Sequence, residues 1–275
     1  MKFLSRFYIA IIFLILYAPI LVVVLFSFNE SGNLSSFSGF SLYWYKDLFR
    51  NSEAITALKN SLFLAVTSSL LATVIGTLAA SSIAHSKNKF YKKTMKTVSN
   101  IPMMNPDIVT GVSMMLLFVG VATILGISDS LGMWTMLLAH TTFNLPYVIL
   151  SVLPKFNQMD KHLIEAALDL GCTPTQTFFK VELPCILPGI VSGLMMGFTL
   201  SLDDFVISHF VSSPDFKTLP LYIYNQTAHE VKFSMYALCT LMIVAILILL
   251  IAVNVANNKK DRRKPAKALR GGGAR

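Results

Sequence analysis

Charged residues are scarce in this chain of 275 residues: Asp, Glu, Lys and Arg together make up 13% of it, and hydrophobic residues make up 54%. Soluble domains average about a quarter charged residues. The deficit comes from long runs that carry no charge at all. Such a composition excludes a disordered chain, a disulfide-stapled secreted module and a typical cytosolic enzyme, and the chain is better counted in membrane spans.

Cysteine is also rare, and no glycine is followed by lysine. Cys172, Cys185 and Cys239 are odd in number and far apart, so we expect three small buried side chains rather than disulfides or a metal site. A phosphate-binding loop of the type G-x-x-x-x-G-K-[ST] needs a Gly-Lys pair. Without one, the chain cannot hold ATP by that device and has to take any such energy from a partner.

Six uncharged runs are long enough to cross about 30 Å of hydrocarbon at roughly 1.5 Å per residue. The first run exceeds the core of a signal peptide, about 7–15 residues, and lacks a small-x-small cleavage site, so we expect a retained helix. The sequence therefore predicts an all-α membrane protein with six transmembrane helices. The runs are 7–29, 60–84, 108–128, 130–154, 185–202 and 233–258.

The positive charges alternate between the two sides of these spans. If the N-terminus is inside, the inner segments hold 18 of the 23 Lys and Arg residues, which predicts that both termini are cytosolic. The net charge of +9 then comes from basic residues that face anionic lipid headgroups, and it does not indicate binding to nucleic acid. We predict three regions: a first helix with its outer segment at 1–56, a membrane core at 57–256 with a cytosolic loop at 155–184, and a basic cytosolic tail at 257–275.

The inner loop at 155–184 predicts two short helices joined at a glycine. Residues 160–170 can form a helix that Asp160 caps and Gly171 ends. The run 173–176, Thr-Pro-Thr-Gln, has the cap, proline and glutamine that start a second helix. We expect that helix to stop before Pro184 and the next span to begin at Pro188. On physical grounds alone, this elbow is either an ordinary amphipathic surface loop or a docking site for a soluble partner.

Three acids border or interrupt the apolar runs: Asp107, Asp203 and Asp204. An ionisable residue within a span costs about 2.5–3.5 kcal/mol and tends to face a cavity or a partner. Asn105 could cap a helix that Pro106 opens, which would leave Asp107 in a favourable first turn. Asp203 and Asp204 could equally lie in the outer headgroup zone.

The functional alternative is that these carboxylates line a passage for a cation with more than one positive charge, which needs counter-charges in a low-dielectric path. Tyr222, with Tyr224 nearby, could add aromatic faces that attract cations. We expect His140 and His209, which also lie in apolar runs, to be hydrogen-bonded packing residues.

The loop motif is Glu165-Ala166-Ala167, three residues, Gly171, nine residues, and then Val-Glu-Leu-Pro at 181–184. It closely resembles the EAA loop of ABC importer permeases, and valine for isoleucine at 181 is the only departure. The resemblance implies that Glu165, Ala166, Ala167 and Gly171 form a coupling helix that fits a groove of an ATPase subunit. ATP and Mg would then be bound by that partner, and this chain would be non-catalytic, with no cofactor of its own.

The stretches 103–109, 201–211 and 219–224 resemble those of spermidine/putrescine permeases, most closely the C-type subunit, and the likeness extends over nearly the whole chain. His209 departs from the family pattern, which leaves selectivity among polyamines open. The resemblance implies a type I ABC importer permease in the bacterial inner membrane, with a sister permease subunit, two copies of an ATPase subunit and a periplasmic polyamine-binding protein. It would import polyamines past Asp203, Asp204, Asp107 and Tyr222.

Three other functions remain open at this point. The nearest is a permease of the same type for another solute, such as an amino acid or ferric ion. A secondary carrier or channel would work without ATP, and a membrane anchor or assembly factor would transport nothing.

Overall fold

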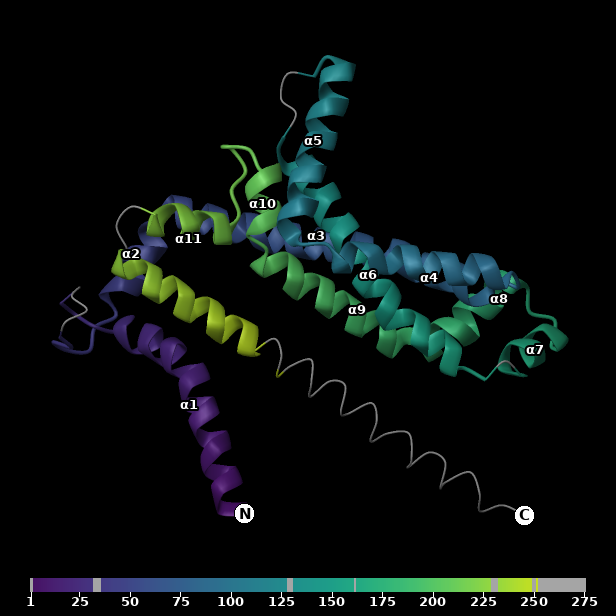
Figure 1. The fold of residues 1–275 in the computed structure, drawn as a ribbon, viewed down its shortest axis with the longest axis horizontal. Coiled ribbons are helices and arrows are strands. Elements are labelled where there is room, and N and C mark those ends of the chain that lie inside the picture. The colour runs from purple at the N-terminus through teal and green to yellow at the C-terminus, as the bar shows by residue number, and fades with distance from the viewer. Residues whose placement is uncertain are drawn as a thin grey trace. The chain divides into compact units, whose positions relative to one another are not determined.

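The computed structural model describes residues 2–31, 36–127, 131–160, 162–228, 232–248 and 251. Within these ranges the chain is helical, with two isolated β-bridges and no longer strand (Figure 1). Its internal contacts divide it into two units, Thr56–Tyr222 and the pair of segments Met1–Ile55 and Ile223–Arg275.

Five helices among the described residues are long and apolar enough to cross a membrane, which confirms the all-α, multi-span prediction. A sixth apolar helix, Phe233–Ile248, is shorter, and its predicted continuation to 258 lies outside the described residues apart from Ile251. The predicted tail at 257–275 also lies outside them. The five helices are α1 (Lys2–Phe26), α3 (Ser52–His85), α5 (Asp107–Leu125), α6 (Met133–Gln158) and the stretch Pro174–Asp203, which contains α9 (Leu183–Asp203).

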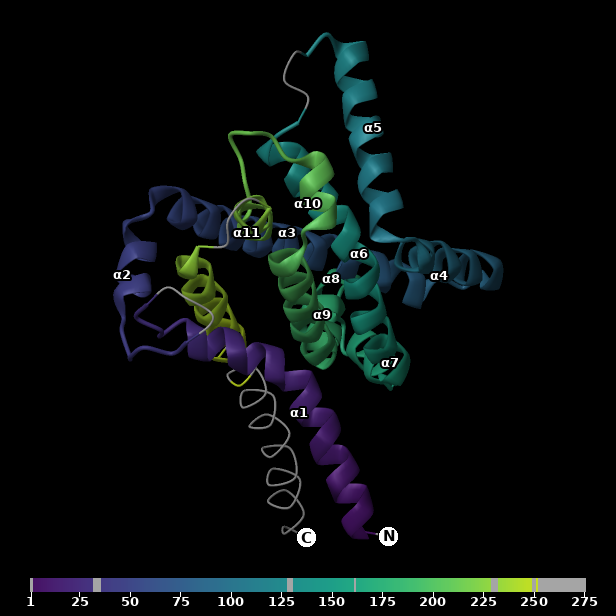
Figure 2. The ribbon, with the colours of Figure 1, turned by 60° about the vertical axis from the view of Figure 1, so that its left-hand side comes forward.

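Helices α6 and α9 form the centre of the larger unit and lie side by side in both ribbon views (Figures 1 and 2). Three glycines of α9, each four residues apart, face α6. A Cβ on Gly189 would lie 2.8 Å from the Ser151 carbonyl oxygen, and one on Gly193 would lie 3.2 Å from Val148 Cα. The third, Gly197, faces Asn144. The two backbones can approach this closely only because these positions carry no side chain.

The basic segment between the second and third predicted spans forms a helix, α4 (Lys89–Met104), that the sequence analysis did not predict. Asn88 caps it by accepting hydrogen bonds from the Phe90 and Tyr91 N–H groups at 2.9 and 3.3 Å. After Asn105 the chain turns sharply, and α5 leaves α4 at a steep angle (Figure 2). The expectation that Asn105 caps a helix opened by Pro106 is wrong, because Pro106 itself takes the N-cap position and no side chain caps the helix. Asn105 is extended, and α5 begins at Asp107.

The expected break before Pro184 is also wrong. Helix α8 (Pro174–Thr177), the π turn η1 (Phe178–Glu182) and α9 follow one another without interruption, so that 174–203 is one helix of 30 residues. In the π turn the Leu183 N–H reaches back to the Phe178 carbonyl. A turn widened in this way relieves the clash that a proline otherwise makes with the preceding turn. Pro184 and Pro188 therefore both lie inside what we call the 174–203 helix.

Two shorter helices follow it, α10 (Val206–Val211) and α11 (Leu219–Thr227). The link between them is held to α3 by two hydrogen bonds. Asn60 Nδ2 donates to the Lys217 carbonyl at 3.0 Å, and Ser61 Oγ accepts from the Leu219 N–H at 2.7 Å. The start of α3 and the start of α11 are therefore fixed to one another within the larger unit.

In the smaller unit, hydrogen bonds of Asn29 and Trp44 hold the segment after α1 against α2 (Tyr43–Arg50). The Asn29 amide donates to the Ser36 carbonyl at 2.9 Å, and the Trp44 indole N–H donates to the Asn29 carbonyl at 2.8 Å. Trp44 belongs to α2, and its ring lies 5.5 Å from that of Phe233. The aromatic run at 43–45 thus supplies packing between three segments that are distant in sequence.

All three cysteines are free, but they are less buried than we expected. Cys185 is exposed, and Cys172 and Cys239 are half-buried. Cys185 lies early in α9, where only the face that carries Glu182, Ile186 and Gly189 is covered, so a small apolar side chain beside that face stays accessible.

Candidate functional site

The glycine elbow predicted in the inner loop is present. Helix α7 (His162–Asp169) ends at Gly171, whose φ of +85° lies in the left-handed region that glycine adopts at little cost. The Gly171 N–H bonds to the Leu168 carbonyl at 2.9 Å and the Cys172 N–H to the Ala167 carbonyl at 3.0 Å. These two bonds form a Schellman motif, which satisfies carbonyls at the end of the helix.

The second helix of the elbow begins with the reciprocal cap that its sequence predicts. The Gln176 N–H donates to Thr173 Oγ1 at 3.3 Å, and the Thr173 N–H donates to Gln176 Oε1 at 3.2 Å. Because this cap is the first turn of the 174–203 helix, the elbow is continuous with a membrane-length helix. A displacement of the elbow therefore acts directly on that helix.

The elbow presents both a small-residue face and exposed apolar side chains. Ala167 is buried, whereas Glu165 and Ala166 are exposed. The Glu165 carboxylate oxygen Oε2 lies 3.2 Å from His162 Nδ1. Large apolar side chains are exposed beside them, with Leu170 86% accessible. Apolar surface of this kind outside the spans is typical of a protein contact. The exposed side chains are Leu163, Leu168, Leu170 and Phe179.

A buried acid next to the elbow escaped the sequence analysis. Glu182, in the π turn, is 4% exposed, and its Oε1 lies 3.1 Å from Nε2 of His85, the last residue of α3. Glu182 stands in the Val-Glu-Leu-Pro ending of the loop motif, but the motif gave it no role. Its partner lies 97 residues away and could not be read from local pattern.

A second polar cluster is buried where α3, α6, α9 and α10 meet. His140 of α6 is fully buried, with Nδ1 2.6 Å from Ser201 Oγ and Nε2 3.1 Å from Ser208 Oγ. Ser201 Oγ also lies 3.0 Å from Ser68 Oγ of α3. The expectation that His140 is a hydrogen-bonded packing residue is confirmed.

Of the two adjacent acids, one points into this cluster and one does not. Asp204 accepts from the Ile207 and Ser208 N–H groups at 3.2 and 2.8 Å, and its Oδ2 lies 3.5 Å from His140 Nε2. Asp204 thus holds the start of α10, in the manner of a helix cap. Asp203, the last residue of α9, is exposed.

Asp107 and Tyr222 are placed differently again. Asp107 is exposed at the first position of α5. Four residues on, Gly111 packs against α10, where a Cβ would lie 2.9 Å from the Phe210 ring and 3.5 Å from the Val206 carbonyl. Asp107 therefore lies about one helical turn from a contact with the helix that Asp204 caps. Tyr222 is only 4% exposed, so its ring is not presented to a solute in this arrangement.

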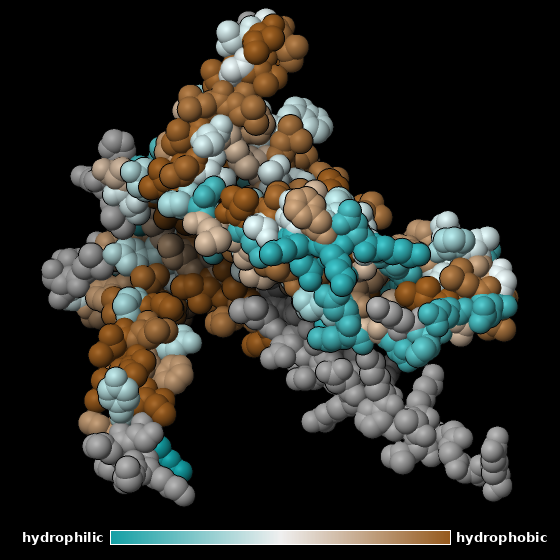
Figure 3. Space-filling model, turned by 45° about the vertical axis from the view of Figure 1, so that its right-hand side comes forward, coloured by the Kyte–Doolittle hydropathy of each residue, from teal (hydrophilic) through white to brown (hydrophobic). Residues whose placement is uncertain are grey.

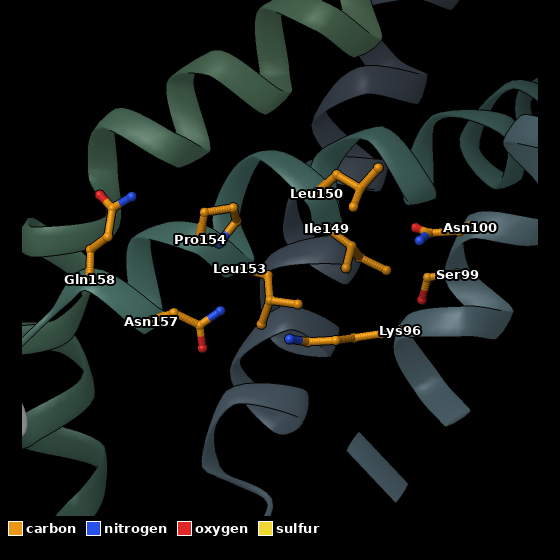
Figure 4. A pocket seen from close by; sticks show the side chains of 9 residues that line it. All are labelled: Lys96, Ser99, Asn100, Ile149, Leu150, Leu153, Pro154, Asn157 and Gln158. Carbon is orange, nitrogen blue, oxygen red and sulfur yellow. The ribbon is translucent and has the colours of Figure 1, made fainter. Parts of the chain in front are cut away.

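A groove between α4 and α6 has a volume of about 310 Å³ (Figure 4). Lys96, Ser99 and Asn100 line it from α4, and the opposite wall comes from α6. None of the predicted site residues lies in it, and the ammonium group of Lys96 would repel a cation. The groove is therefore not a candidate passage for a polycation. The α6 residues are Ile149, Leu150, Leu153, Pro154, Asn157 and Gln158.

Only two positions of helix α5, Gly111 and Ala122, are buried among the described residues, and Met114 and Phe118 are partly covered. In Figure 3 the column that α5 forms at the top carries mostly hydrophobic side chains. Leu116, Leu117 and Ile124 are more than half exposed. Such a surface is stable only against lipid or another apolar protein surface.

These features define a helical protein with several membrane-length helices, one of which continues from a glycine elbow, and comparison with known proteins identifies its class. Residues 72–263 match the family described as binding-protein-dependent transport system inner membrane component. The chain belongs to this family, whose members are non-catalytic, multi-pass inner-membrane permease subunits of ABC transporters that work with a separate ATPase subunit.

Several characterised relatives are similar over most of their length. The chain is 39% identical over 260 residues to the spermidine/putrescine transport system permease protein PotC of Haemophilus influenzae, covering 94% of this chain and 98% of that protein. It is 38% identical over 234 residues to the putrescine transport system permease protein PotI of Escherichia coli K12, covering 85% and 83%. It is 36% identical over 252 residues to PotC of the same strain, covering 91% and 92%.

Solved structures of ABC transporters share the fold. A chain of a bacterial transporter that imports the acidic polysaccharide alginate superposes with a TM-score of 0.73 at 18% identity, covering 95% of each chain. A chain of the MetNI methionine transporter in an inward-facing conformation superposes with a TM-score of 0.59 at 21% identity, covering 82% of this chain and 99% of that one. The type I ABC permease fold predicted from the sequence is confirmed.

Proposed function

We propose that this chain is the C-type permease subunit of an ATP-driven importer that moves polyamines, putrescine or spermidine, into the bacterial cytoplasm. The relatives that are 36–39% identical carry the names of putrescine and spermidine/putrescine permeases. The observation that carries the mechanism is the continuity between the elbow and the 174–203 helix, which ends at Asp203. One continuous helix thus links a surface for a motor to a carboxylate for the substrate.

At the cytosolic end, Glu165, Ala166, Ala167 and Gly171 would sit in a groove of the ATPase subunit, which binds ATP and Mg. The left-handed turn at Gly171 sets the angle between α7 and the 174–203 helix. That helix is about 45 Å long at 1.5 Å per residue, enough to carry a displacement across the membrane. This arrangement requires both termini on the cytosolic side, as the distribution of lysine and arginine predicts.

At the other end, Asp203, Asp204 and Asp107 would replace water around the ammonium groups of the substrate. Asp203 is exposed and is the most direct candidate, whereas Asp204 already bonds two N–H groups and acts on the substrate through its charge. Tyr222 would reach the substrate only after a rearrangement that uncovers its ring. The complete importer would contain this chain, a sister permease subunit, two copies of the ATPase subunit and a periplasmic polyamine-binding protein.

The deciding experiment is uptake of radiolabelled putrescine into proteoliposomes that hold the full complex, with ATP inside or outside. We expect uptake that needs ATP on the cytosolic side, is competed by spermidine, and falls about tenfold when Asp203→Asn and Asp204→Asn are combined, since each counter-charge stabilises a buried cation. A matched variant, Asp47→Asn in α2, should transport normally. Competition by an amino acid or ferric ion instead would assign another solute, and uptake without ATP would assign a secondary carrier.

A further inference from the structure

Glu182 is a charged side chain in an unusual place, a π turn at the point where the elbow becomes a spanning helix. It is 4% exposed, and carboxylates are almost never buried to that degree unless they are paired. Its Oε1 lies 3.1 Å from His85 Nε2. Its Oε2 is also buried and has no hydrogen-bond partner among the described residues, so the bond to His85 carries the whole compensation for burying the carboxylate.

Both ring nitrogens of His85 lie close to oxygen atoms of other groups. Nδ1 lies 2.9 Å from the Ser81 carbonyl, which can only accept, and 3.4 Å from the Ser81 hydroxyl. Nε2 faces the Glu182 carboxylate, so each ring nitrogen has an acceptor within hydrogen-bond distance. His85 is the last residue of α3, so this contact ties the end of that helix to the π turn. The ring also packs edge-on against Phe156 of α6, with centroids 5.8 Å apart.

The contact between Glu182 and His85 holds a segment of the 174–203 helix that is prone to bending. A π turn interrupts the regular hydrogen-bond ladder and is a common site of kinks in helices. A displacement that enters at the elbow could be absorbed at Phe178–Glu182 and never reach α9. With Glu182 bonded to His85, the same displacement has to carry the end of α3 with it. The π turn is therefore fixed to α3 through His85, whose ring in turn packs against Phe156 of α6.

We infer that Glu182 is a positioning residue: through its ion pair with His85 it makes α3 move together with the 174–203 helix when the ATPase displaces the elbow. This inference rests on the proposed function, because it needs a motor at the elbow. It gives the buried acid a role in coupling rather than in substrate binding. It also predicts that breaking the pair separates ATP hydrolysis from transport without releasing the ATPase.

The first test measures putrescine taken up per ATP hydrolysed by the full complex in proteoliposomes, for wild type, Glu182→Gln and His85→Asn. Glu182→Gln removes the charge of the carboxylate at nearly constant size, and His85→Asn removes the imidazole that contacts it. We expect the ratio to fall about tenfold, a typical size for coupling between two sites, while the amount of ATPase bound is unchanged. Glu53→Gln, an exposed acid in the first turn of the same α3, should leave the ratio as in wild type. If the variants lower only the yield or thermal stability of the complex and the ratio stays normal, the pair is merely structural and the inference is wrong.

The second test does not depend on the substrate. Spin labels on Ser82→Cys and Thr175→Cys, in a chain whose native cysteines are replaced by serine, report the distance between α3 and the start of the 174–203 helix. We expect the same distance with and without ATP trapped in the complex in wild type, and a shift on trapping in Glu182→Gln. A shift already present in wild type would overturn the inference. If wild type takes up no putrescine but passes this test, the proposed substrate is wrong and the pairing of the two helices stands.

Discussion

The imidazole of His140 and the hydroxyl of Ser201 lie 2.6 Å apart in the interior of the helix bundle. This contact joins the middle of α6 to the last turns of α9, and Ser68 extends it to α3. The other nitrogen of the ring reaches Ser208 and Asp204 at the start of α10. A fully buried network of this kind fixes the relative position of four helices, because every member loses a partner if one helix shifts.

Replacing His140 by leucine should therefore destabilise the protein. The change leaves buried polar groups on α9 and α10 unsatisfied, and each such group costs about 1–3 kcal/mol. Thermal unfolding of the purified complex measures the effect. The matched control is Thr142→Val, an exposed position on the same helix whose hydroxyl bonds only to the Leu138 carbonyl, and we expect it to change stability by less than about 0.5 kcal/mol. Equal melting temperatures for the two variants would contradict the network's importance.

Substitution of the two adjacent acids, Asp203 and Asp204, should have different effects on stability and uptake. Asp204→Asn weakens the two bonds to the Ile207 and Ser208 N–H groups, so it should lower stability by about 1–2 kcal/mol, as removal of a helix cap does. Asp203→Asn changes an exposed side chain and should leave stability unchanged while reducing putrescine uptake. Thermal unfolding and uptake measured on both variants decide the point. Loss of uptake in Asp204→Asn alone, at normal stability, would reverse the assignment.

The sequence predicts the elements of this fold whose signals are local. The elbow is one such case, since the Gly171 stop and the Thr173–Gln176 cap depend on residues within one helical turn, and both are found where expected. The spans are another, because length without charge is enough to mark them.

Long-range partners and helix junctions were not predictable in the same way. The break expected at Pro184 is wrong because a π turn widens the helix just before it, a rearrangement that no residue type announces. The pairing of Glu182 with His85 and the inward turn of Asp204 both depend on how distant helices pack. The sequence identified Asp203 and Asp204 as a pair, but only tertiary contacts distinguish the exposed carboxylate from the capping one.

The glycine stripe on α9 predicts a cost of overpacking. A Cβ on Gly189 would lie 2.7 Å from Lys155 Cγ and 2.8 Å from the Ser151 carbonyl, and the carbonyl cannot move without shifting α6. Gly189→Ala should destabilise the complex by about 1–3 kcal/mol, measured by thermal unfolding. Gly120→Ala, on α5, adds the same methyl group where nothing lies within 4 Å and should be neutral or slightly stabilising. A neutral result at Gly189 would mean that the two helices are less tightly packed than their geometry shows.

Gly171→Ala tests the elbow against a control with the same backbone strain. Both Gly171, with φ of +85°, and Gly126, with φ of +70°, have open space around a new Cβ, so alanine at either position meets only the cost of left-handed backbone, about 1–2 kcal/mol. At Gly126 that strain lies at the end of α5, and we expect normal ATP-driven uptake and normal retention of the ATPase subunit. At Gly171 the same strain changes the angle between α7 and the 174–203 helix, so we expect weaker retention of the ATPase on affinity purification and a matching loss of uptake. Because local stability changes equally in the two variants, a difference between them can come only from the contact that the elbow makes, and equal behaviour would remove the elbow from the coupling mechanism.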